Sequence, residues 1–326
     1  AFCHAVSGNP ACVYDALLNH KSSLDKYGDE IAWHYHHADW TDIMGTGDSC
    51  WNQLLTFNST GYMHGSDIEI AERSLNYMLL KRGFFPCSFR SGWTWENNDF
   101  SNWLENIMPF DFSANPGYKN EPGKDRCRRN VNDWLRAPRT YSGYHPACSD
   151  FQTRGTMKRV IFRTNEFKGR SGYRQMRDII NKAVKGEDQL VCITTHSYND
   201  IRKYIDDILP DILAYCDSLY ISVQFQTASE AAASTQGTGS LAGPEIEVER
   251  HNDSLIISVH EDIFQNAPYC AIEHSSGSVS RIYPQQMKDR EWVVWLNDAE
   301  ELAFACAVSS LNGQTSVVKL NLCREK

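Results

Sequence analysis

The sequence predicts an α/β fold followed by a small all-β sandwich. In the first two thirds of the chain, short apolar strands alternate with amphipathic helices, as in proteins built on a parallel sheet. A linker rich in Gly, Ser and Thr follows at residues 235–244, and beyond it short segments of alternating polarity recur at regular spacing without a strong helix. We therefore predict one domain over residues 1–236 and a β-sandwich domain over residues 245–326.

The elements of the first domain follow from hydrophobic periodicity. Helices are expected over residues 66–82, 100–108, 172–184, 200–216 and 227–234. Strands are expected over residues 1–6, 31–36, 109–113, 159–163, 189–198 and 219–225, with a further short strand ending at Arg90. Strands of the sandwich are expected over residues 245–250, 254–260, 269–274, 292–296, 302–308 and 317–322.

Composition excludes several classes of protein. The chain of 326 residues has 41% hydrophobic and 22% charged residues, which is typical of a folded protein, and its net charge of -9 argues against nucleic acid or an anionic membrane as a partner. Its 11 cysteines form no CxxC motif, so neither a zinc finger nor a small disulfide framework is indicated. No apolar run is long enough to cross a bilayer and no signal peptide is seen. We expect a soluble, cytoplasmic protein, and its oligomeric state cannot be predicted.

The segment of residues 28–40 concentrates the most reactive chemistry, because it contains His34, His36 and His37. As a strand it places His34 and His36 on one face, while Trp33 and Tyr35 take the other. Two neutral imidazoles side by side suit a divalent metal, most readily zinc. His37 replaces one of them if the register is shifted, and a histidine-rich strand end without a ligand is the alternative interpretation.

Three further segments of the chain contain candidate residues for a carbohydrate site. Arg90 ends a predicted strand and is followed by Trp93 and Trp95 in a Gly-containing loop, a combination that suits sugar binding but also a buried Arg with packing rings. Tyr144 and His145 lie in a second loop and are predicted to bind substrate. His196 stands at the polar end of an apolar strand, where it is a candidate catalytic residue or a satisfied structural histidine.

These motifs occur in the order His34-x-His36, Phe89-Arg90-Ser91-Gly92-Trp93 and Thr195-His196-Ser197. In that order the chain resembles the polysaccharide deacetylase family of carbohydrate esterases. The resemblance covers roughly the first two thirds of the chain and implies a deformed β/α barrel that holds a metal through two histidines and an aspartate. It implies that His34 and His36 are metal ligands, that Arg90 orients the catalytic carboxylate, and that His196 is the general acid.

The family's Thr-x-Asp-Asp strand, which supplies the metal aspartate and the catalytic base, has no counterpart in this chain. We expect it in a segment upstream of Ala1, although a third ligand could come from Asp39, His145 or Asp150. The function implied is metal-dependent deacylation, chiefly N-deacetylation, of an amino sugar in the synthesis of a polysaccharide or its precursor. The alternatives are a non-catalytic glycan-binding relative and a glycoside hydrolase with carboxylates such as Glu96 and Asp99.

Overall fold

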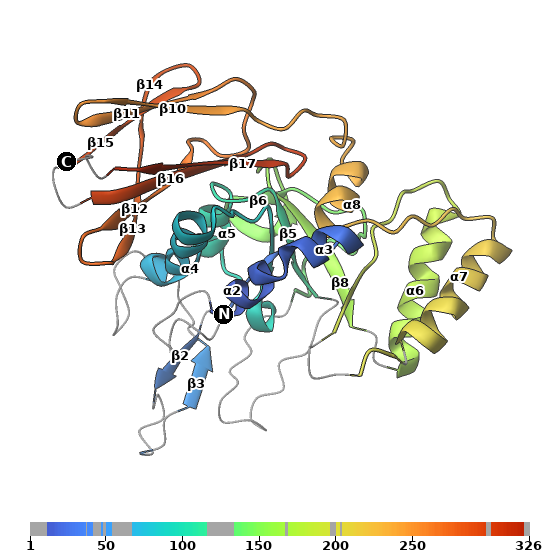
Figure 1. Ribbon diagram of the computed structural model, residues 1–326. Coiled ribbons are helices and arrows are strands. Elements are labelled where there is room, and N and C mark those ends of the chain that lie inside the picture. The colour runs from blue at the N-terminus through green and yellow to red at the C-terminus, as the bar shows by residue number, and fades with distance from the viewer. Residues whose placement is uncertain are drawn as a thin grey trace.

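The computed structural model describes residues 12–36, 38–41, 47, 50–53, 67–115, 134–166, 169–195, 200–202, 204–297 and 301–322. Figure 1 shows a central parallel sheet with helices beside it, a β-sandwich of the C-terminal strands above α4, and α6 and α7 as a helical pair at one side. None of the described helices is both long and apolar enough to cross a membrane.

The central sheet has five strands in the order β1-β4-β5-β8-β9, and all of its pairs are parallel. Its strands are β1 (Trp33–Tyr35), β4 (Ser88–Ser91), β5 (Phe110–Ala114), β8 (Val160–Glu166) and β9 (Cys192–Thr194). Neighbours in the sheet follow one another along the chain, as they do in a barrel. The closed, deformed barrel predicted from the sequence is nevertheless wrong, because within the described residues the sheet ends at β9 and does not pair back to β1.

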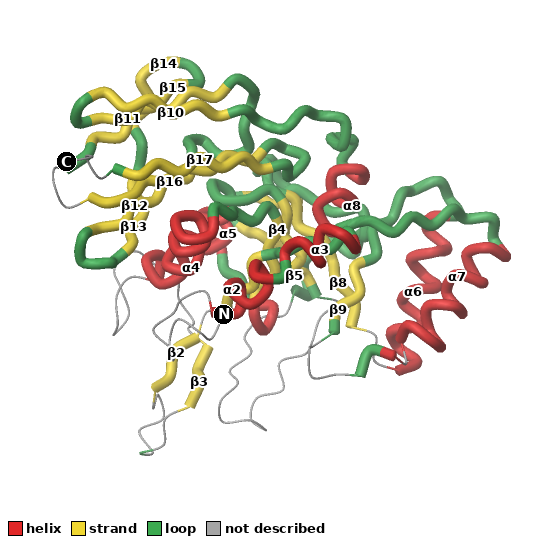
Figure 2. Tube along the Cα trace, viewed as in Figure 1, coloured by secondary structure: helices red, strands yellow, loops and turns green. Residues whose placement is uncertain are grey.

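The strand that was expected over residues 219–225 is not formed. That segment runs as a loop between α7 and α8 in Figure 2, and its Tyr220 is 98% exposed. The following helix, α8 (Ala228–Thr235), packs Ala232 and Ala233 against Phe110 and Phe162 of the sheet. α8 therefore covers the β5–β8 part of one face of the sheet, and within the described residues the sheet is a half-barrel.

The other face of the sheet is covered by α4 (Asp67–Arg82) and α5 (Asn98–Leu104). Trp33 and Tyr35 of β1 and Phe89 of β4 belong to the same apolar core as these two helices. The remaining helices are α2 (Cys12–Asn19), α3 (Lys21–Tyr27), α6 (Gly169–Ala183) and α7 (Leu209–Ser218), with single turns at Gly92–Thr94 and Tyr204–Ile208. The helices predicted over residues 66–82, 172–184 and 227–234 are thus confirmed to within a few residues at each end.

The C-terminal part forms two four-stranded antiparallel sheets, β10-β11-β15-β14 and β13-β12-β16-β17. Their strands are β10 (Ile246–His251), β11 (Ser254–Val259), β12 (Tyr269–His274), β13 (Val279–Ile282), β14 (Gln285–Lys288), β15 (Glu291–Trp295), β16 (Glu301–Ser309) and β17 (Thr315–Asn321). Side chains such as Leu255, Ile257 and Phe304 fill the space between them. Two small hairpins, β2 (Ala38–Thr41) with β3 (Cys50–Gln53) and β6 (Pro146–Ala147) with β7 (Asp150–Arg154), complete the described strands.

The sandwich and the α/β part share one apolar core across α4. Tyr269 and Ala305 of the sandwich lie in the same cluster as Leu75 of α4. Beside this cluster the Glu72 carboxylate, which is 4% exposed, accepts hydrogen bonds from Arg281 of β13 and, at 3.3 Å, from Trp103 Nε1. The sandwich is thus fixed on the helix layer by packing as well as by a buried ion pair.

Candidate functional site

The candidate site begins at β1, an edge strand whose side chains alternate as the sequence predicts. Trp33 and Tyr35 are buried and their rings stack at 5.4 Å, whereas His34 and His36 are half-buried on the opposite face of the strand. The outer edge of the strand is closed by Tyr14 of α2. Its hydroxyl accepts a hydrogen bond from His34 N at 2.7 Å and donates one to His34 O at 3.0 Å. One side chain therefore satisfies both backbone groups that an edge strand leaves open at this position.

The two imidazole rings point their Nε2 atoms at each other. His34 Nε2 lies 3.1 Å from His36 Nε2, and the rings are nearly perpendicular at 88°. On its other side His34 Nδ1 lies 2.7 Å from the carbonyl oxygen of Arg90. Because a carbonyl can only accept, Nδ1 of His34 carries the proton and its Nε2 presents a lone pair toward His36.

This arrangement fits a divalent metal. A metal-binding histidine commonly donates its second ring N–H to a backbone carbonyl, as His34 does. Two tetrahedral nitrogen ligands at about 2.05 Å from zinc lie roughly 3.3 Å apart, close to the separation of the two Nε2 atoms. No third His, Cys, Asp or Glu joins the pair within the part of the chain that the structure describes. His34 and His36 would therefore supply two ligands of a metal.

Gly92 leaves the space that the His36 ring occupies. A Cβ atom built on Gly92 would lie 2.3 Å from Cγ of His36, far inside van der Waals contact. Gly92 opens the single turn after β4, so the turn that follows Arg90 packs directly on the second imidazole. The orientation of His36 thus depends on a glycine at position 92.

We expect Gly92→Ala to displace the His36 ring and to weaken zinc binding by about 10- to 100-fold, the usual cost of disturbing the surroundings of a metal ligand. The measurement is competition with a chromophoric chelator. Gly239→Ala is the matched control, since an added Cβ there meets no atom closer than 3.9 Å. Equal zinc affinity in the two variants would contradict the role assigned to Gly92.

Arg90 stands next to the histidine pair. In the parallel ladder of β1 and β4, Arg90 is the register partner of His34. Burial raises the pKa of the Cys192 thiol on β9 to about 11, and the positive charge of Arg90 opposes this rise. Arg90 therefore brings a positive charge to the strand next to the histidine pair, where it can attract an anionic or polarised group.

The other predicted site residues either have local contacts away from the histidine pair or are not among the described residues. Trp95 is 1% exposed and packs against Phe100 in the core. Tyr144 is 2% exposed and donates its hydroxyl proton to Phe151 O at 2.9 Å. His145 is exposed, with Nδ1 2.9 Å from Met157 O. His37, His196 and the side chains of Trp93 and Asp39 are outside the described residues.

Two of the proposed alternatives for a third ligand are described and do not join the pair. Asp150 forms a two-pronged ion pair with Arg136, with distances of 2.5 and 3.2 Å. This hydrogen bonding lowers the pKa of the Asp150 carboxyl despite its partial burial. Asp150 and His145 thus have local structural partners rather than a place beside His34.

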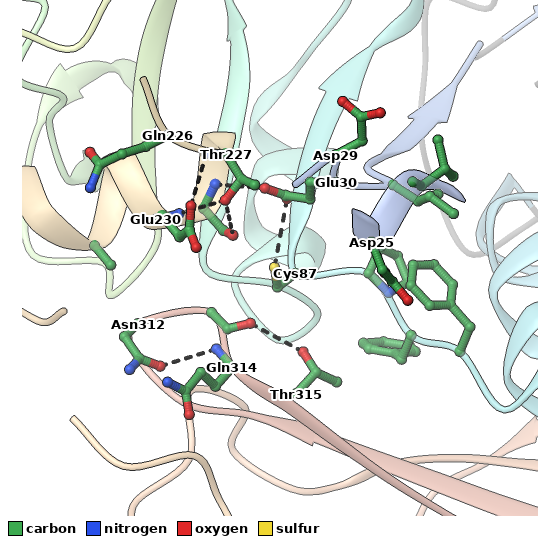
Figure 3. Close-up of a pocket in the computed structure, with 18 of the residues that line it drawn as sticks. Asp25, Asp29, Glu30, Cys87, Gln226, Thr227, Glu230, Asn312, Gln314 and Thr315 are labelled. Atoms are coloured by element: carbon green, nitrogen blue, oxygen red, sulfur yellow. Dashed lines mark hydrogen bonds between the residues drawn. The ribbon is translucent and has the colours of Figure 1, made fainter. Parts of the chain in front are cut away.

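A cavity of about 660 Å³ lies at the opposite, amino-terminal ends of β1 and β4 (Figure 3). Its acidic groups hold secondary structure in place: Glu30 accepts a hydrogen bond from Ser229 N at 2.8 Å, and Glu230 forms the capping box of α8 with Thr227. Asp25 pairs with Lys21 at 2.6 Å. These carboxylates already stabilise the helices around the cavity, so we place the functional site at the histidine pair.

A buried ionic cluster that was not predicted from the sequence lies between α5 and the sheet. Arg159, Glu96 and Asp111 have fully buried side chains, and Arg159 Nη2 lies 2.8 Å from Glu96 Oε1 while the same guanidinium contacts Asp111 and Ser101. Charged residues placed between apolar residues of predicted strands, as in Phe110-Asp111-Phe112, were the available signal. Glu96 is thus part of the core, whereas Asp99 is exposed, which is no arrangement for a pair of glycosidase carboxylates.

Comparison with known proteins does not assign the chain to a family. No protein-family model and no curated protein matches the chain. Among solved structures it matches a crystal structure of bovine butyrophilin at 14% identity and a TM-score of 0.17, over 25% of this chain and 44% of that chain. A match this weak carries no argument about fold or activity.

Proposed function

We propose that the protein is a metal-dependent hydrolase that removes the acyl group from an amino sugar. The observation that carries the proposal is the convergence of His34 Nε2 and His36 Nε2, with the tautomer of His34 fixed by the Arg90 carbonyl. The order of the three sequence motifs, which resembles the polysaccharide deacetylases, supports a carbohydrate as the substrate.

The reaction is hydrolysis of an amide. His34 and His36 would hold a divalent metal, which would polarise the acyl oxygen and lower the pKa of a water molecule. In the overall reaction the oxygen of water bonds to the acyl carbon, the C–N bond breaks, the nitrogen takes up a proton and leaves as the free amine, and the acyl group leaves as the carboxylate. Arg90, on the strand next to His34, would attract the negative charge that develops on the acyl oxygen. His196 remains the predicted donor of the proton to the leaving amine.

The test is the metal content and the activity of His34→Ala. Purified wild-type protein is expected to hold about one divalent ion per chain. The variant is expected to lose this ion, and its release of acetate from N-acetylated chito-oligosaccharides should fall at least about a hundredfold.

His145→Ala is the matched control, because His145 is an exposed histidine with only local contacts described. It should keep both metal and activity. A wild-type protein that binds no metal after mild purification would contradict the proposal. Sugar binding without turnover would point instead to a non-catalytic glycan-binding protein.

A further inference from the structure

The backbone of His34 is held by a residue from a different element, Tyr14 of α2. Within the described residues β1 pairs with β4 alone, so its other edge has no strand beside it. At that edge the Tyr14 hydroxyl accepts a hydrogen bond from His34 N at 2.7 Å and donates one to His34 O at 3.0 Å. Two hydrogen bonds to the backbone of one residue fix its position, and with it the direction in which its side chain leaves the strand.

That direction matters because both ring nitrogens of His34 have defined partners. Nδ1 lies 2.7 Å from the carbonyl oxygen of Arg90, and Nε2 lies 3.1 Å from Nε2 of His36. A binding constellation works only if its groups are held within roughly 0.5 Å of the productive geometry. A small shift of the His34 backbone would lengthen one of the two contacts. Tyr14 therefore acts on the orientation of the candidate metal ligand without touching the metal position itself.

Helix α2 depends on its contacts with the rest of the protein. It has eight residues, and isolated helices shorter than about 12 residues are barely stable in water. Among the side chains of α2 that the structure describes, Tyr14 alone is buried, at 4% exposure, whereas Val13 and Leu17 are exposed. The helix is thus anchored by the same side chain that holds His34.

The polar contacts of α2 with its neighbour α4 lie at the surface (Figure 1). Asp15 interacts with the Tyr77 hydroxyl at 3.4 Å and with Arg82 Nε at 3.5 Å, and Arg82 also donates a hydrogen bond to Asn19. Ion pairs and hydrogen bonds that remain partly exposed contribute little to stability. Docking of α2 therefore depends chiefly on the ring and the hydroxyl of Tyr14.

We propose that Tyr14 is the positioning residue of the metal ligand His34, and that docking of α2 on β1 is coupled to metal binding. Coupling of this kind rests on the proposed function and assigns to its metal site a regulatory element outside the ligand set. A metal that requires His34 in this orientation favours the docked helix. By linkage, the docked helix favours the metal by the same factor.

The first measurement is the zinc affinity of the full chain, by competition with a chromophoric chelator. Tyr14→Phe removes only the hydroxyl and should weaken zinc binding by about 10-fold, the lower end of what disturbing the surroundings of a metal ligand costs. Tyr77→Phe is the matched control, because it also removes a tyrosine hydroxyl that bonds to α2 but has no described bond to His34. Its zinc affinity should equal that of the wild type.

The second measurement is hydrogen exchange of the α2 amides with and without zinc. In the wild type, zinc should slow this exchange by about the same 10-fold factor, since coupling is reciprocal. The slowing should persist in Tyr77→Phe and should be absent in Tyr14→Phe and in His34→Ala. A merely structural Tyr14 would alter the exchange equally with and without zinc. The wild-type comparison needs no variant and stays decisive if Tyr14→Phe disturbs the fold.

Failure of this coupling differs from failure of the proposed function. Equal zinc affinity in Tyr14→Phe and Tyr77→Phe, or wild-type exchange that zinc does not change, would overturn the role of Tyr14 while the metal site stands. Protection of α2 by zinc without any release of acetate would leave the coupling standing and remove the deacylase. A wild-type protein that binds no zinc would overturn both, and its metal content alone would show this.

Discussion

Replacement of Arg159 by methionine is expected to lower the free energy of unfolding by about 3–5 kcal/mol at pH 7, because it leaves buried carboxyl groups without their cation. Arg159 is fully buried and its guanidinium contacts Glu96, Asp111 and the hydroxyl of Ser101. Methionine approximates the length of the arginine stem, so the change removes charge and hydrogen bonds more than volume. Unfolding by urea, followed by tryptophan fluorescence, gives the difference.

Arg136→Met is the matched control for this prediction. Arg136 also forms a two-pronged pair with a carboxylate, Asp150, but its side chain is 65% exposed. Exposed ion pairs contribute at most about 1 kcal/mol, so the control should lose far less stability. If the two variants lost similar free energy of unfolding at pH 7, the buried ion pairs would contribute no more to stability than the exposed pair, and the prediction would be wrong.

Local periodicity was sufficient to predict individual helices and strands, although the predicted closed barrel was wrong. Alternation over residues 31–36 placed the two histidines opposite Trp33 and Tyr35, and the helical spacing of residues 66–82 gave α4. In the sandwich, β11 has the apolar alternation of a half-buried strand, whereas β16 is an almost continuous apolar run that is buried from Phe304 onward. The strands that were missed, β13 and β14, lack buried side chains, so no apolar pattern marks them.

The sequence could not show that the sheet stays open, because closure depends on contacts between distant parts of the chain. Residues 219–225 alternate like a strand, yet the place beside β9 and β1 is shared by α8 and the loop before it. The bond from Ser229 N to Glu30 joins α8 to the start of β1, and nothing in either segment alone indicates that pairing. The same holds at the site, where the contact between His34 and the carbonyl of Arg90 arises from the register of two strands.

The second prediction with a large expected effect concerns the contribution of Glu96 to the free energy of unfolding, which should depend on pH. Burial, together with the neighbouring Asp111 carboxyl, raises the pKa of Glu96 from 4.5 to about 8, against the attraction of Arg159. In the folded protein Glu96 then keeps its proton in a pH range where the unfolded chain has released it. Because the folded protein binds this proton more tightly than the unfolded chain does, proton binding stabilises the fold. The contribution is fully present below pH 4.5 and is lost as the pH rises to about 8. The loss across that window is on the order of 5 kcal/mol.

Glu96→Gln should therefore remove this part of the pH dependence, because the amide stays neutral and keeps a donor for Asp111. We expect stability close to that of the wild type at pH 5 and a clear gain over the wild type at pH 8.5, measured as the midpoint of urea unfolding in both buffers. Asp99→Asn, an exposed carboxylate in the first turn of α5, is the control and should leave the slope with pH unchanged. If Glu96→Gln kept the slope of the wild type, Glu96 would be ionised in the native core, with its charge balanced by the buried Arg159.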